Sequence, residues 1–309
     1  MTHLRIAVIG GGANCEHAVS LASAASVADA LARRGHDVVR LTIDPDGWWL
    51  APDGSVLGLA RSVEVLRSCE VAVPVVHGPR GEDGTLAALL DLAGVPYVGS
   101  GVRAGALAMD KWTTKLIAQA LGIRTAPGVL LTAPYHEFSG PVVVKPVAAG
   151  SSQGVSLVRT PDELTPALES AFALDSRVLV EEVVRGREID IAVLGHQAER
   201  RVSPPLEIVA EGLFDYDAKY GGHADFRIPA VLAPADRKAL EDAAVAMFDA
   251  LGCSGVARVD FFLTEDGPVL NEVNTMPGFT EHSQVPRMFA ADGLPYGDLL
   301  DLLVHAALP

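Results

Sequence analysis

Three oxygen-bearing side chains near the end of the chain could together hold a metal ion. They are Asp260, Glu272 and Asn274, and Arg258 lies just before them. Carboxylates and amides offer oxygen ligands, which favour a hard cation such as Mg²⁺ over zinc, and an incomplete ligand set leaves room for substrate phosphates. Two carboxylates that face each other across strands repel unless a cation lies between them. These residue types therefore predict a magnesium site, with a solvated acidic hairpin as the alternative.

The surrounding sequence predicts the β-hairpin that would bring these side chains together. Apolar and functional residues alternate from 255 to 264 and again from 268 to 274, so each strand has one apolar and one functional face. A three-residue loop with Gly267 at its left-handed position suits the connection. All the functional side chains then share one face. This loop fixes three cross-strand pairs, give or take one bulge: Thr264 with Pro268, Asp260 with Glu272, and Arg258 with Asn274.

A second candidate site lies in the middle of the chain, where an apolar strand, residues 141–145, ends in Lys145. The small-residue loop that follows, residues 149–154, contains Ser151 and Ser152. Its backbone N–H groups and hydroxyls are donors that could lie over phosphates, with Lys145 and Lys111 as nearby positive charges. A flexible hairpin tip is the alternative. The sequence contains no G-x-x-x-x-G-K-[ST] pattern, so this is not a P-loop protein.

The beginning of the chain has the pattern of a strand, a glycine loop and a helix. Residues 4–9 have the pattern of a short, mainly apolar strand, Gly10 to Gly12 follow, and a helical pattern runs from Glu16 to Arg34. A second strand, residues 38–43, ends in an acidic residue, so a NAD-dependent or other non-ligase nucleotide-binding protein is an alternative. The fingerprint G-x-G-x-x-G fails, however, because Cys15 occupies its last position.

A histidine marks the end of the next buried strand. Residues 71–76 are apolar and run into a loop, residues 77–85, that is rich in glycine and charge and begins with His77. Ligands collect at the carboxyl edge of a parallel sheet. We therefore predict that His77 lines a site, against the alternative of an ordinary loop histidine bonded to the backbone.

The rest of the chain continues to alternate between helical and extended patterns. Residues 211–229 form a long polar loop of the kind that often closes over substrates. The other predicted elements are helices ending near 93 and at 102–121, 163–174, 235–251 and 294–308, and strands at 129–132, 155–158, 178–182 and from 188 onward.

Composition limits the classes of protein that this chain can belong to. With 309 residues, of which 49% are hydrophobic, it can build two or three domains with real cores. The net charge of −15 argues against a nucleic-acid partner, and three scattered cysteines argue against a disulfide framework or a structural zinc site. The chain opens on a strand rather than a signal peptide and has no apolar run of membrane-spanning length, so we expect a soluble cytoplasmic protein without membrane contact.

Lysine is scarce in this sequence. Only five of the 24 basic residues are Lys, and the others are Arg. Where any surface cation would serve, such a chain uses Arg, so a Lys beside a glycine-rich or proline-marked turn indicates a need for a compact ammonium group.

Taken in order, these segments resemble the D-alanine-D-alanine ligases of the ATP-grasp superfamily over nearly the full length of the chain. The motifs that carry the resemblance are G-G-x-x-x-E-H-x-V-S-L at 11–21, H-G-x-x-G-E-D-G-T at 77–85, Y-V-G-S-G-V at 97–102, M-D-K at 109–111, V-K-P with G-S-S-x-G at 144–154, D-Y-x-A-K-Y at 215–220, and R-V-D with N-E-V-N-T-M-P-G-F-T within 258–280.

The resemblance implies an α/β fold in the ATP-grasp arrangement, with three domains. Residues 1–100 would form a Rossmann-like domain with a parallel sheet. Residues 101–181 and 182–309 would form two α+β ATP-grasp subdomains, the second of which carries the metal and catalytic residues. The resemblance also implies a homodimer.

The activity implied is that of an ATP-dependent carboxylate-amine ligase that makes D-alanyl-D-alanine for peptidoglycan. ATP would phosphorylate the carboxylate of one D-alanine, and the amine of a second would attack the acylphosphate. Two Mg²⁺ ions, or Mn²⁺, would be held between the ATP phosphates. By this resemblance the metal ligands are Asp260, Glu272 and Asn274, the groups at the phosphates are Lys111, Lys145, Ser152 and Lys219, and those bordering adenine and ribose are Glu181, Val184 and Glu188.

The same resemblance assigns residues to the two amino acids. Glu16 would bind the ammonium of the first amino acid and connect through Ser151 and Tyr220 to the lid loop, and Arg258 with the backbone N–H of Gly278 would stabilise the oxyanion of the tetrahedral intermediate. The lid sequence around Lys219 favours an amine over a hydroxy-acid acceptor. The remaining assignments are Val19 and His77 to the first pocket and Ser283 to the carboxylate of the second amino acid.

Some positions depart from the family pattern. Asn14 and Cys15 precede Glu16 where small residues are usual, and Gln284 stands where an apolar residue is expected near the second side chain. None of these changes removes a catalytic group. The alternative that stays open is an ATP-grasp ligase of specialised metabolism, in an antibiotic biosynthetic or resistance pathway, with a different amino-acid pair.

Overall fold

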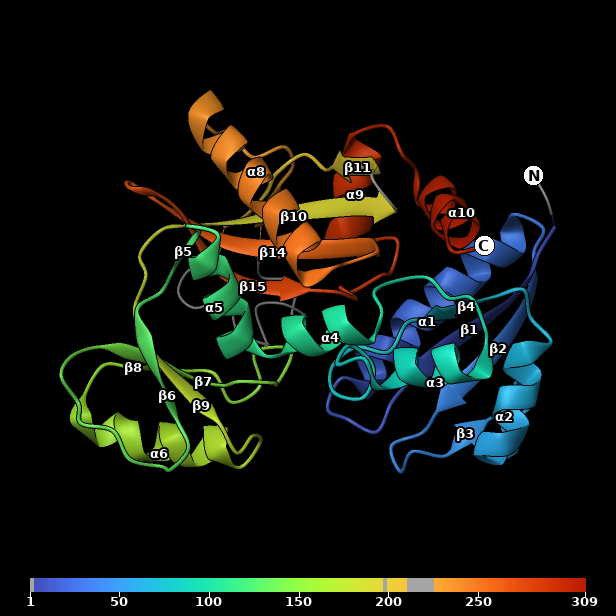
Figure 1. Cartoon of the computed structure of the whole chain (residues 1–309), viewed down its shortest axis with the longest axis horizontal. Helices are drawn as coiled ribbons and strands as arrows, with labels where there is room; N and C mark the ends of the chain where they lie inside the picture. Colours follow the sequence, from blue (N-terminus) through green and yellow to red (C-terminus); the bar gives the residue numbers. More distant parts are fainter. Residues whose placement is uncertain (1–2, 197–198, 210–224) are drawn as a thin grey trace.

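The computed structural model describes residues 3–196, 199–209 and 225–309. In this part of the chain the helices and strands are arranged around three β-sheets (Figure 1). The expected mixed α/β fold is therefore confirmed, while its division into three domains stays a prediction. Each sheet is apolar where helices cover it, and two of them turn polar residues towards a common cleft.

The first sheet is built by the beginning of the chain. Its elements are β1 (Arg5–Gly11), α1 (His17–Arg33), β2 (Asp37–Ile43), β3 (Trp49–Leu50), α2 (Gly58–Arg67), β4 (Val71–Pro74) and α3 (Thr85–Ala93). The strand order is β3-β2-β1-β4, and β1 is parallel to both β2 and β4. Ile6 and Val8 of β1 pack with α1, whereas Ala7 and Ile9 pack with α2 and α3. This is the pattern of a parallel strand that helices cover on both faces.

The second sheet is antiparallel and has the order β6-β9-β7-β8. Its elements are β6 (Gly128–Leu131), β7 (Val142–Pro146), β8 (Ser156–Val158), α6 (Pro161–Phe172) and β9 (Val178–Glu182). Because side chains alternate along a strand, Val144 and Val180 pack under α6. Their neighbours Lys145 and Glu181 line the cleft on the opposite face.

The third sheet is the longest and carries the predicted metal hairpin. Its strands are β5 (Arg124–Thr125), β10 (Arg187–His196), β11 (Glu199–Val202), β12 (Leu206–Val209), β13 (Asp225–Arg227), β14 (Gly255–Thr264) and β15 (Gly267–Asn274). The helices that pack on one face are α4 (Val102–Met109), α5 (Lys111–Ala120) and α8 (Pro234–Leu251). Val259 and Phe261 of β14 point into that apolar layer, so Arg258 and Asp260 point to the cleft.

The helix expected from 102 to 121 is interrupted. Asp110 has an extended backbone, with φ −82° and ψ 94°, and separates α4 from α5. Its side chain caps α5 by accepting a hydrogen bond of 2.9 Å from the backbone N–H of Thr113, as acidic N-cap residues do. The prediction of one continuous helix was wrong because no Gly or Pro marks the break. The interruption places Lys111 at the first turn of α5, beside the cleft.

Two further differences concern short elements. The sequence analysis did not anticipate α2 or α9 (Gln284–Ala291), and the closing helix α10 (Tyr296–Ala306) begins later than expected. α9 ends before Gly293, which has a left-handed φ of +76° and allows the chain to turn into α10.

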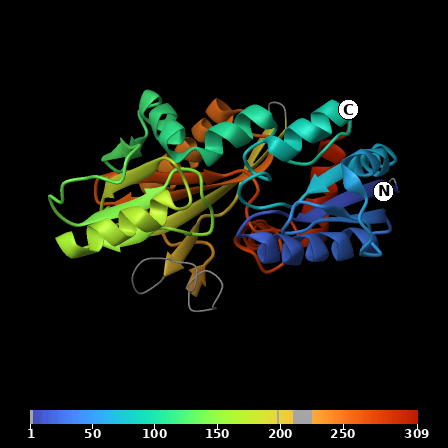
Figure 2. The ribbon, with the colours of Figure 1, turned by 90° about the horizontal axis from the view of Figure 1, so that it is seen from below.

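Contacts cross the expected domain boundaries at two places. β5, α4 and α5 come from the segment assigned to the central domain but pack with the third sheet. α10 comes from the end of the chain and packs with α1 and with β4 of the first sheet, and α9 packs with α10. Seen from below, α3, α4 and α5 follow one another along one side of the molecule (Figure 2).

Candidate active site

A single cleft of about 970 Å³ collects the predicted site residues from all three sheets. Every predicted site residue within the described ranges lines it, from Glu16 in the loop before α1 to Gln284 at the start of α9. Lys219 and Tyr220 lie outside the described residues. The individual roles of the lining residues stay predictions.

The hairpin of β14 and β15 has the expected pairing at its functional end. Asp260 lies opposite Glu272 and Arg258 opposite Asn274. The turn itself differs from the prediction, because Thr264 pairs with Gly267 and the loop has two residues rather than three. A bulge beside Asp260 compensates for this difference. The alternation of side chains along the strands was enough to predict the pairing of Asp260 with Glu272. The composition of the turn did not distinguish a two-residue loop from a three-residue loop.

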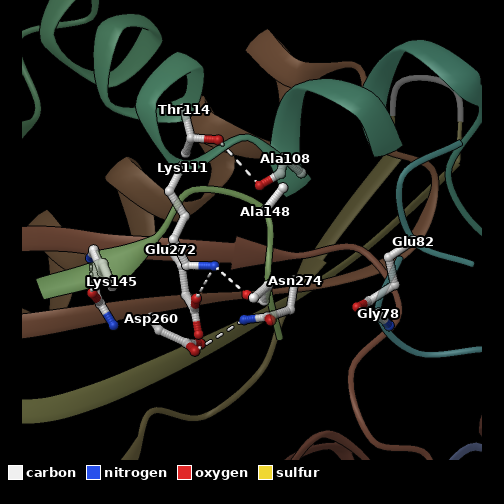
Figure 3. Close-up of polar contacts among 12 residues, drawn as sticks. Gly78, Glu82, Ala108, Lys111, Thr114, Lys145, Ala148, Asp260, Glu272 and Asn274 are labelled. Carbon is white, nitrogen blue, oxygen red and sulfur yellow. Dashed lines mark hydrogen bonds and ion pairs between the residues drawn. The ribbon is translucent and has the colours of Figure 1, made fainter. Parts of the chain in front are cut away.

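The charges of this hairpin are balanced by protein cations. Nε and Nη2 of Arg258 each donate to a carboxylate oxygen of Asp260 at 2.7 Å, and Asn274 Nδ2 donates to Asp260 Oδ2 at 3.0 Å. Lys111 Nζ lies 3.3 Å from Glu272 Oε2, and Figure 3 shows this pair beside Asp260 and Asn274. Burial lowers the pKa of Arg258, but the carboxylates of Asp260 and Asp190 outweigh it and raise the pKa overall. The guanidinium is therefore permanently charged.

The oxygen set of the hairpin fits a hard divalent cation shared with a phosphate-bearing substrate. Within residues 3–196, 199–209 and 225–309, no group of three or more His, Cys, Asp and Glu side chains is arranged to hold a metal ion. Asp260, Glu272 and Asn274 instead supply two carboxylates and an amide from neighbouring strands. A cation here needs further oxygens from its substrate, which is how Mg²⁺ is bound in nucleotide sites.

A buried carboxylate with two lysines lies on the neighbouring sheet. Lys145 Nζ is 2.7 Å from Glu181 Oε2, and Lys115 forms an ion pair with the same carboxylate. Burial raises the pKa of Glu181, but the two ammonium groups outweigh it and leave the pKa below its usual value. Lys115 was not among the predicted site residues. The scarcity of lysine was the signal that could have found it, since three of the five lysines, Lys111, Lys115 and Lys145, form ion pairs with Glu272 or Glu181, which line the cleft.

The loop after β1 presents the buried side chain of Glu16 to the cleft. Asn14 holds this loop in place: its Oδ1 accepts from the backbone N–H of Glu16 at 2.8 Å, and its Nδ2 donates to the carbonyls of His77 and Pro79. A Cβ atom on Gly150 would lie 2.0 Å from Glu16 Oε1. The small-residue loop that was predicted from the sequence therefore reaches the carboxylate of Glu16, and a side chain at position 150 would displace that carboxylate or the loop.

His77 connects two loops that come from distant parts of the chain. Its Nδ1 lies 2.8 Å from the carbonyl of Met276, to which it donates, and its Nε2 lies 2.9 Å from Ser23 Oγ. Both ring nitrogens are therefore used within the protein. His77 lines the cleft as expected, but its ring contributes to the site by holding the 276–279 loop against α1.

Glu82 is a second residue of this loop pair, and the sequence analysis assigned it no role. It accepts hydrogen bonds from the backbone N–H groups of Gly78 at 2.9 Å and Met276 at 3.1 Å (Figure 3). Burial and the neighbouring charge of Glu16 raise the pKa of Glu82 to about 8. The sequence signals for Glu82 were its place in the loop after a buried strand and its position in the H-G-x-x-G-E-D-G-T motif at 77–85.

His77 should make the stability of the protein depend on pH. Burial lowers the pKa of His77 to about 4, below the usual value of about 6.5. The neutral ring is thus favoured by folding, and its contribution is full above about pH 6.5 and is lost as the pH falls towards 4, a total of roughly 3 kcal/mol. In denaturant unfolding, His77→Gln should lose less stability than the unsubstituted protein between about pH 7.5 and about pH 4.5. His282→Gln, at an exposed position, is the control, and equal pH slopes for His77→Gln and the unsubstituted protein would contradict this assignment.

Gln284 lies in the cleft but its side-chain amide faces other protein groups. Its Oε1 accepts from Arg258 Nη1 at 2.6 Å, and its Nε2 donates to Asp190 Oδ2 at 3.0 Å. Ser283 precedes it at the N-terminus of α9, and Ser283 Oγ accepts from the backbone N–H of Thr280 at 3.0 Å. The 276–284 segment thus borders the cleft with both backbone and side-chain polar groups.

The chain matches two family models that together span most of its length. Residues 124–305 match the model described as D-ala D-ala ligase C-terminus, and residues 5–62 and 55–100 match that described as D-ala D-ala ligase N-terminus. Among curated proteins, the chain is 38% identical to a D-alanine--D-alanine ligase of Mycobacterium ulcerans, over 99% of this chain and 95% of that protein. It is 40% identical to one of Corynebacterium jeikeium, over 98% of this chain and 96% of that protein.

Solved structures show the same similarity in three dimensions. The VanG D-Ala:D-Ser ligase from Enterococcus faecalis is 35% identical with a TM-score of 0.85, and the alignment covers 99% of this chain and 100% of that one. A D-alanine--D-alanine ligase from Bacillus anthracis complexed with ATP is 28% identical with a TM-score of 0.81, covering 98% and 97%. Within the described residues, no helix is both long and apolar enough to cross a membrane.

Proposed function

This chain is an ATP-dependent ligase of the D-alanine-D-alanine ligase family, and we propose that its cleft joins two D-alanine molecules to D-alanyl-D-alanine. The observation that carries the proposal is the arrangement of the cleft. Carboxylates and lysines suited to a metal-bound nucleotide line it around Glu272 and Lys111. The carboxylate of Glu16, suited to an ammonium group, lies against Gly150 in the same cleft, and Arg258 lies on the third sheet beside them.

The reaction requires a carboxylate to become an electrophile. The γ-phosphoryl group of ATP passes to a carboxylate oxygen of the first D-alanine, which gives an acylphosphate and ADP. The amine of the second D-alanine then attacks the carbonyl carbon, and phosphate leaves as the amide bond forms. Both steps need the substrates held in line and the negative charge stabilised, which is the contribution that positioned side chains make.

The nucleotide would lie between the second and third sheets. Asp260, Glu272 and Asn274 would hold Mg²⁺, two ions by family resemblance, and the metal would neutralise the charge of the transferring phosphoryl group. In this assignment the amide of Asn274 presents its oxygen to the cation. The other nucleotide assignments are Lys111, Lys145, Ser152 and Lys219 to the phosphates, and Glu181, Val184 and Glu188 to adenine and ribose.

The amino acids would lie between the first domain and the 276–284 segment. Glu16 would bind the ammonium group of the first D-alanine, with Ser151 and Tyr220 completing the set and Val19 and His77 bordering the pocket. Arg258 and the backbone N–H of Gly278 would stabilise the oxyanion that develops on the carbonyl oxygen. Ser283, whose hydroxyl lies at the start of α9, would bind the carboxylate of the second D-alanine.

The cellular setting follows from the proposed product. D-alanyl-D-alanine is a building block of peptidoglycan, so the enzyme would serve cell-wall synthesis from the cytoplasm, where ATP is available. A homodimer is the proposed assembly, by family resemblance alone.

Phosphate release tests the proposal directly. The protein is incubated with ATP, MgCl₂ and either one amino acid or a pair of different amino acids, and released phosphate and dipeptide are measured. D-alanine alone should give phosphate and D-alanyl-D-alanine in equal amounts. Release only with a second, different amino acid would replace the proposed acceptor, and absence of turnover with every pair would refute the ligase assignment.

Gly150→Ala should weaken binding of the first amino acid. The added Cβ would meet Glu16 Oε1 at 2.0 Å, so the loop or the carboxylate must move. We expect the KM for D-alanine to rise by about tenfold, equivalent to roughly 1.4 kcal/mol, with the KM for ATP little changed. Gly101→Ala is the matched control, since its Cβ would meet Tyr97 Oη at 3.5 Å. An unchanged KM for D-alanine in Gly150→Ala would show that this loop does not contribute to binding of the first amino acid.

A further inference from the structure

Arg258 has a second anchor in addition to Asp260. Gln284 Oε1 accepts from Arg258 Nη1 at 2.6 Å, Gln284 Nε2 donates to Asp190 Oδ2 at 3.0 Å, and the same Asp190 oxygen lies 3.5 Å from Arg258 Nε. Asp190, Gln284 and Arg258 therefore form a closed triangle of side chains, which we call the arginine anchor.

The arginine anchor joins two parts of the chain around the guanidinium. Asp190 lies on β10 directly opposite Asp260 on β14, and it is only 2% exposed. A buried carboxylate is costly unless a charge or a donor compensates it. Arg258 supplies the charge and Gln284 supplies a donor, so the acid is part of the environment of Arg258 and not a solvated surface group.

The amide of Gln284 has only one suitable orientation in the arginine anchor. A guanidinium can only donate and an ionised carboxylate can only accept. The amide oxygen must therefore face Arg258, and the amide nitrogen must face Asp190. This fixed polarity distinguishes Gln284 from a residue that simply fills the wall of the cleft.

We propose that Asp190 and Gln284 are positioning residues that fix the guanidinium plane of Arg258 for the reaction. The inference rests on the proposed role of Arg258 at the oxyanion. Asp260 alone is a poor anchor for that purpose, because its oxygens are also assigned to the metal ion. Within the arginine anchor, Gln284 holds the guanidinium through Nη1, whereas Asp260 accepts from Nε and Nη2.

Removing the amide tests the arginine anchor. Gln284→Met keeps the length of the side chain and loses both hydrogen bonds, so kcat should fall by about tenfold. The KM for ATP should change by less than about twofold, because the nucleotide residues are untouched. Gln119→Met is the control, since Gln119 donates to Thr125 Oγ1 on the far side of the third sheet, away from Arg258.

A pair of substitutions distinguishes positioning from general damage. Gln284→Glu alone places two carboxylates side by side and should lower kcat by about tenfold, and Asp190→Asn alone should lower it severalfold. Together they exchange the amide and the acid: the new glutamate can accept from Arg258, and the new asparagine can donate to it. Adding Asp190→Asn to Gln284→Glu should therefore raise kcat, although the same change lowers kcat in the unsubstituted protein. Thermal unfolding of each variant without nucleotide shows whether the fold is retained.

The outcomes separate this inference from the proposed function. If the unsubstituted protein does not ligate D-alanine, the proposed function fails. If the unsubstituted protein does ligate D-alanine, two results would refute the arginine anchor and leave the proposed function standing. One is full kcat in Gln284→Met, and the other is a further loss of kcat when Asp190→Asn is added to Gln284→Glu. A rise of kcat in the double variant together with a tenfold loss in Gln284→Met establishes it.

Discussion

Glu272→Gln is expected to lower ligation by about a thousandfold or more while the protein stays folded. The substitution keeps the shape of the side chain but removes the charge that faces Asp260 across the hairpin and pairs with Lys111. Asp260→Asn should have an effect of the same order, because it removes the other carboxylate. Phosphate release measures the loss, and calorimetric titration with ATP at increasing MgCl₂ measures whether the metal-dependent part of nucleotide binding is lost with it.

The same hairpin offers a control for these two variants. Glu265 lies exposed in the turn between β14 and β15, so Glu265→Gln removes one acidic charge from the hairpin without changing the cleft. It should retain full activity. A folded Glu272→Gln variant that turns over at a normal rate would exclude the hairpin as the metal site, and with it the proposed position of the ATP phosphates.

Arg258→Lys should reduce kcat by about 10² to 10³, the effect of losing one well-placed donor to an oxyanion. Lysine keeps the charge but lacks the planar guanidinium group. Arg258 uses that group to donate hydrogen bonds to Asp260 and Gln284 at the same time. Arg258→Met should in addition lower the free energy of unfolding by roughly 3 to 5 kcal/mol, because it leaves two buried carboxylates, Asp190 and Asp260, without their cation.

Kinetics and unfolding distinguish the two effects of Arg258. Arg258→Lys should unfold near the temperature of the unsubstituted protein and lose kcat, whereas Arg258→Met should lose both. Arg237→Lys is the matched control, because Arg237 forms an exposed pair with Glu241 on α8 and should be silent in both measurements. If Arg258→Lys were fully active, the oxyanion would have to be stabilised by other donors.

The sequence predicted those features that depend on neighbouring residues or on regular alternation. The pairing of Asp260 with Glu272 was accessible because the two strands alternate and a short turn joins them. The length of that turn could not be predicted from the sequence, because a bulge beside Asp260 changes the register between the two strands by one residue. The break at Asp110 was missed for a similar reason: an acid that caps a helix also occurs within helices, and only the structure shows which.

The sequence could not predict contacts between residues that are far apart in the chain. Asp190 and Gln284 are 94 positions apart, and neither belongs to a local pattern that names the other. Gln284 was expected beside the second amino acid, and only the fold reveals that its amide is bound to Arg258 and Asp190. Lys115 and Glu82 were missed because each acts through a partner that another segment supplies, Glu181 in one case and the backbone of Met276 in the other.

The packing of α10 against α1 determines when during synthesis the first sheet can be completed. Leu299, Leu300 and Leu303 of α10 cover the same face of that sheet as Val27 and Leu31 of α1, and Arg34 and His36 bind Asp301 across this layer. Until α10 has left the ribosome, β1 therefore has one apolar face that is only partly shielded. The opening hundred residues should consequently remain susceptible to protease on the nascent chain and gain resistance only when α10 is released.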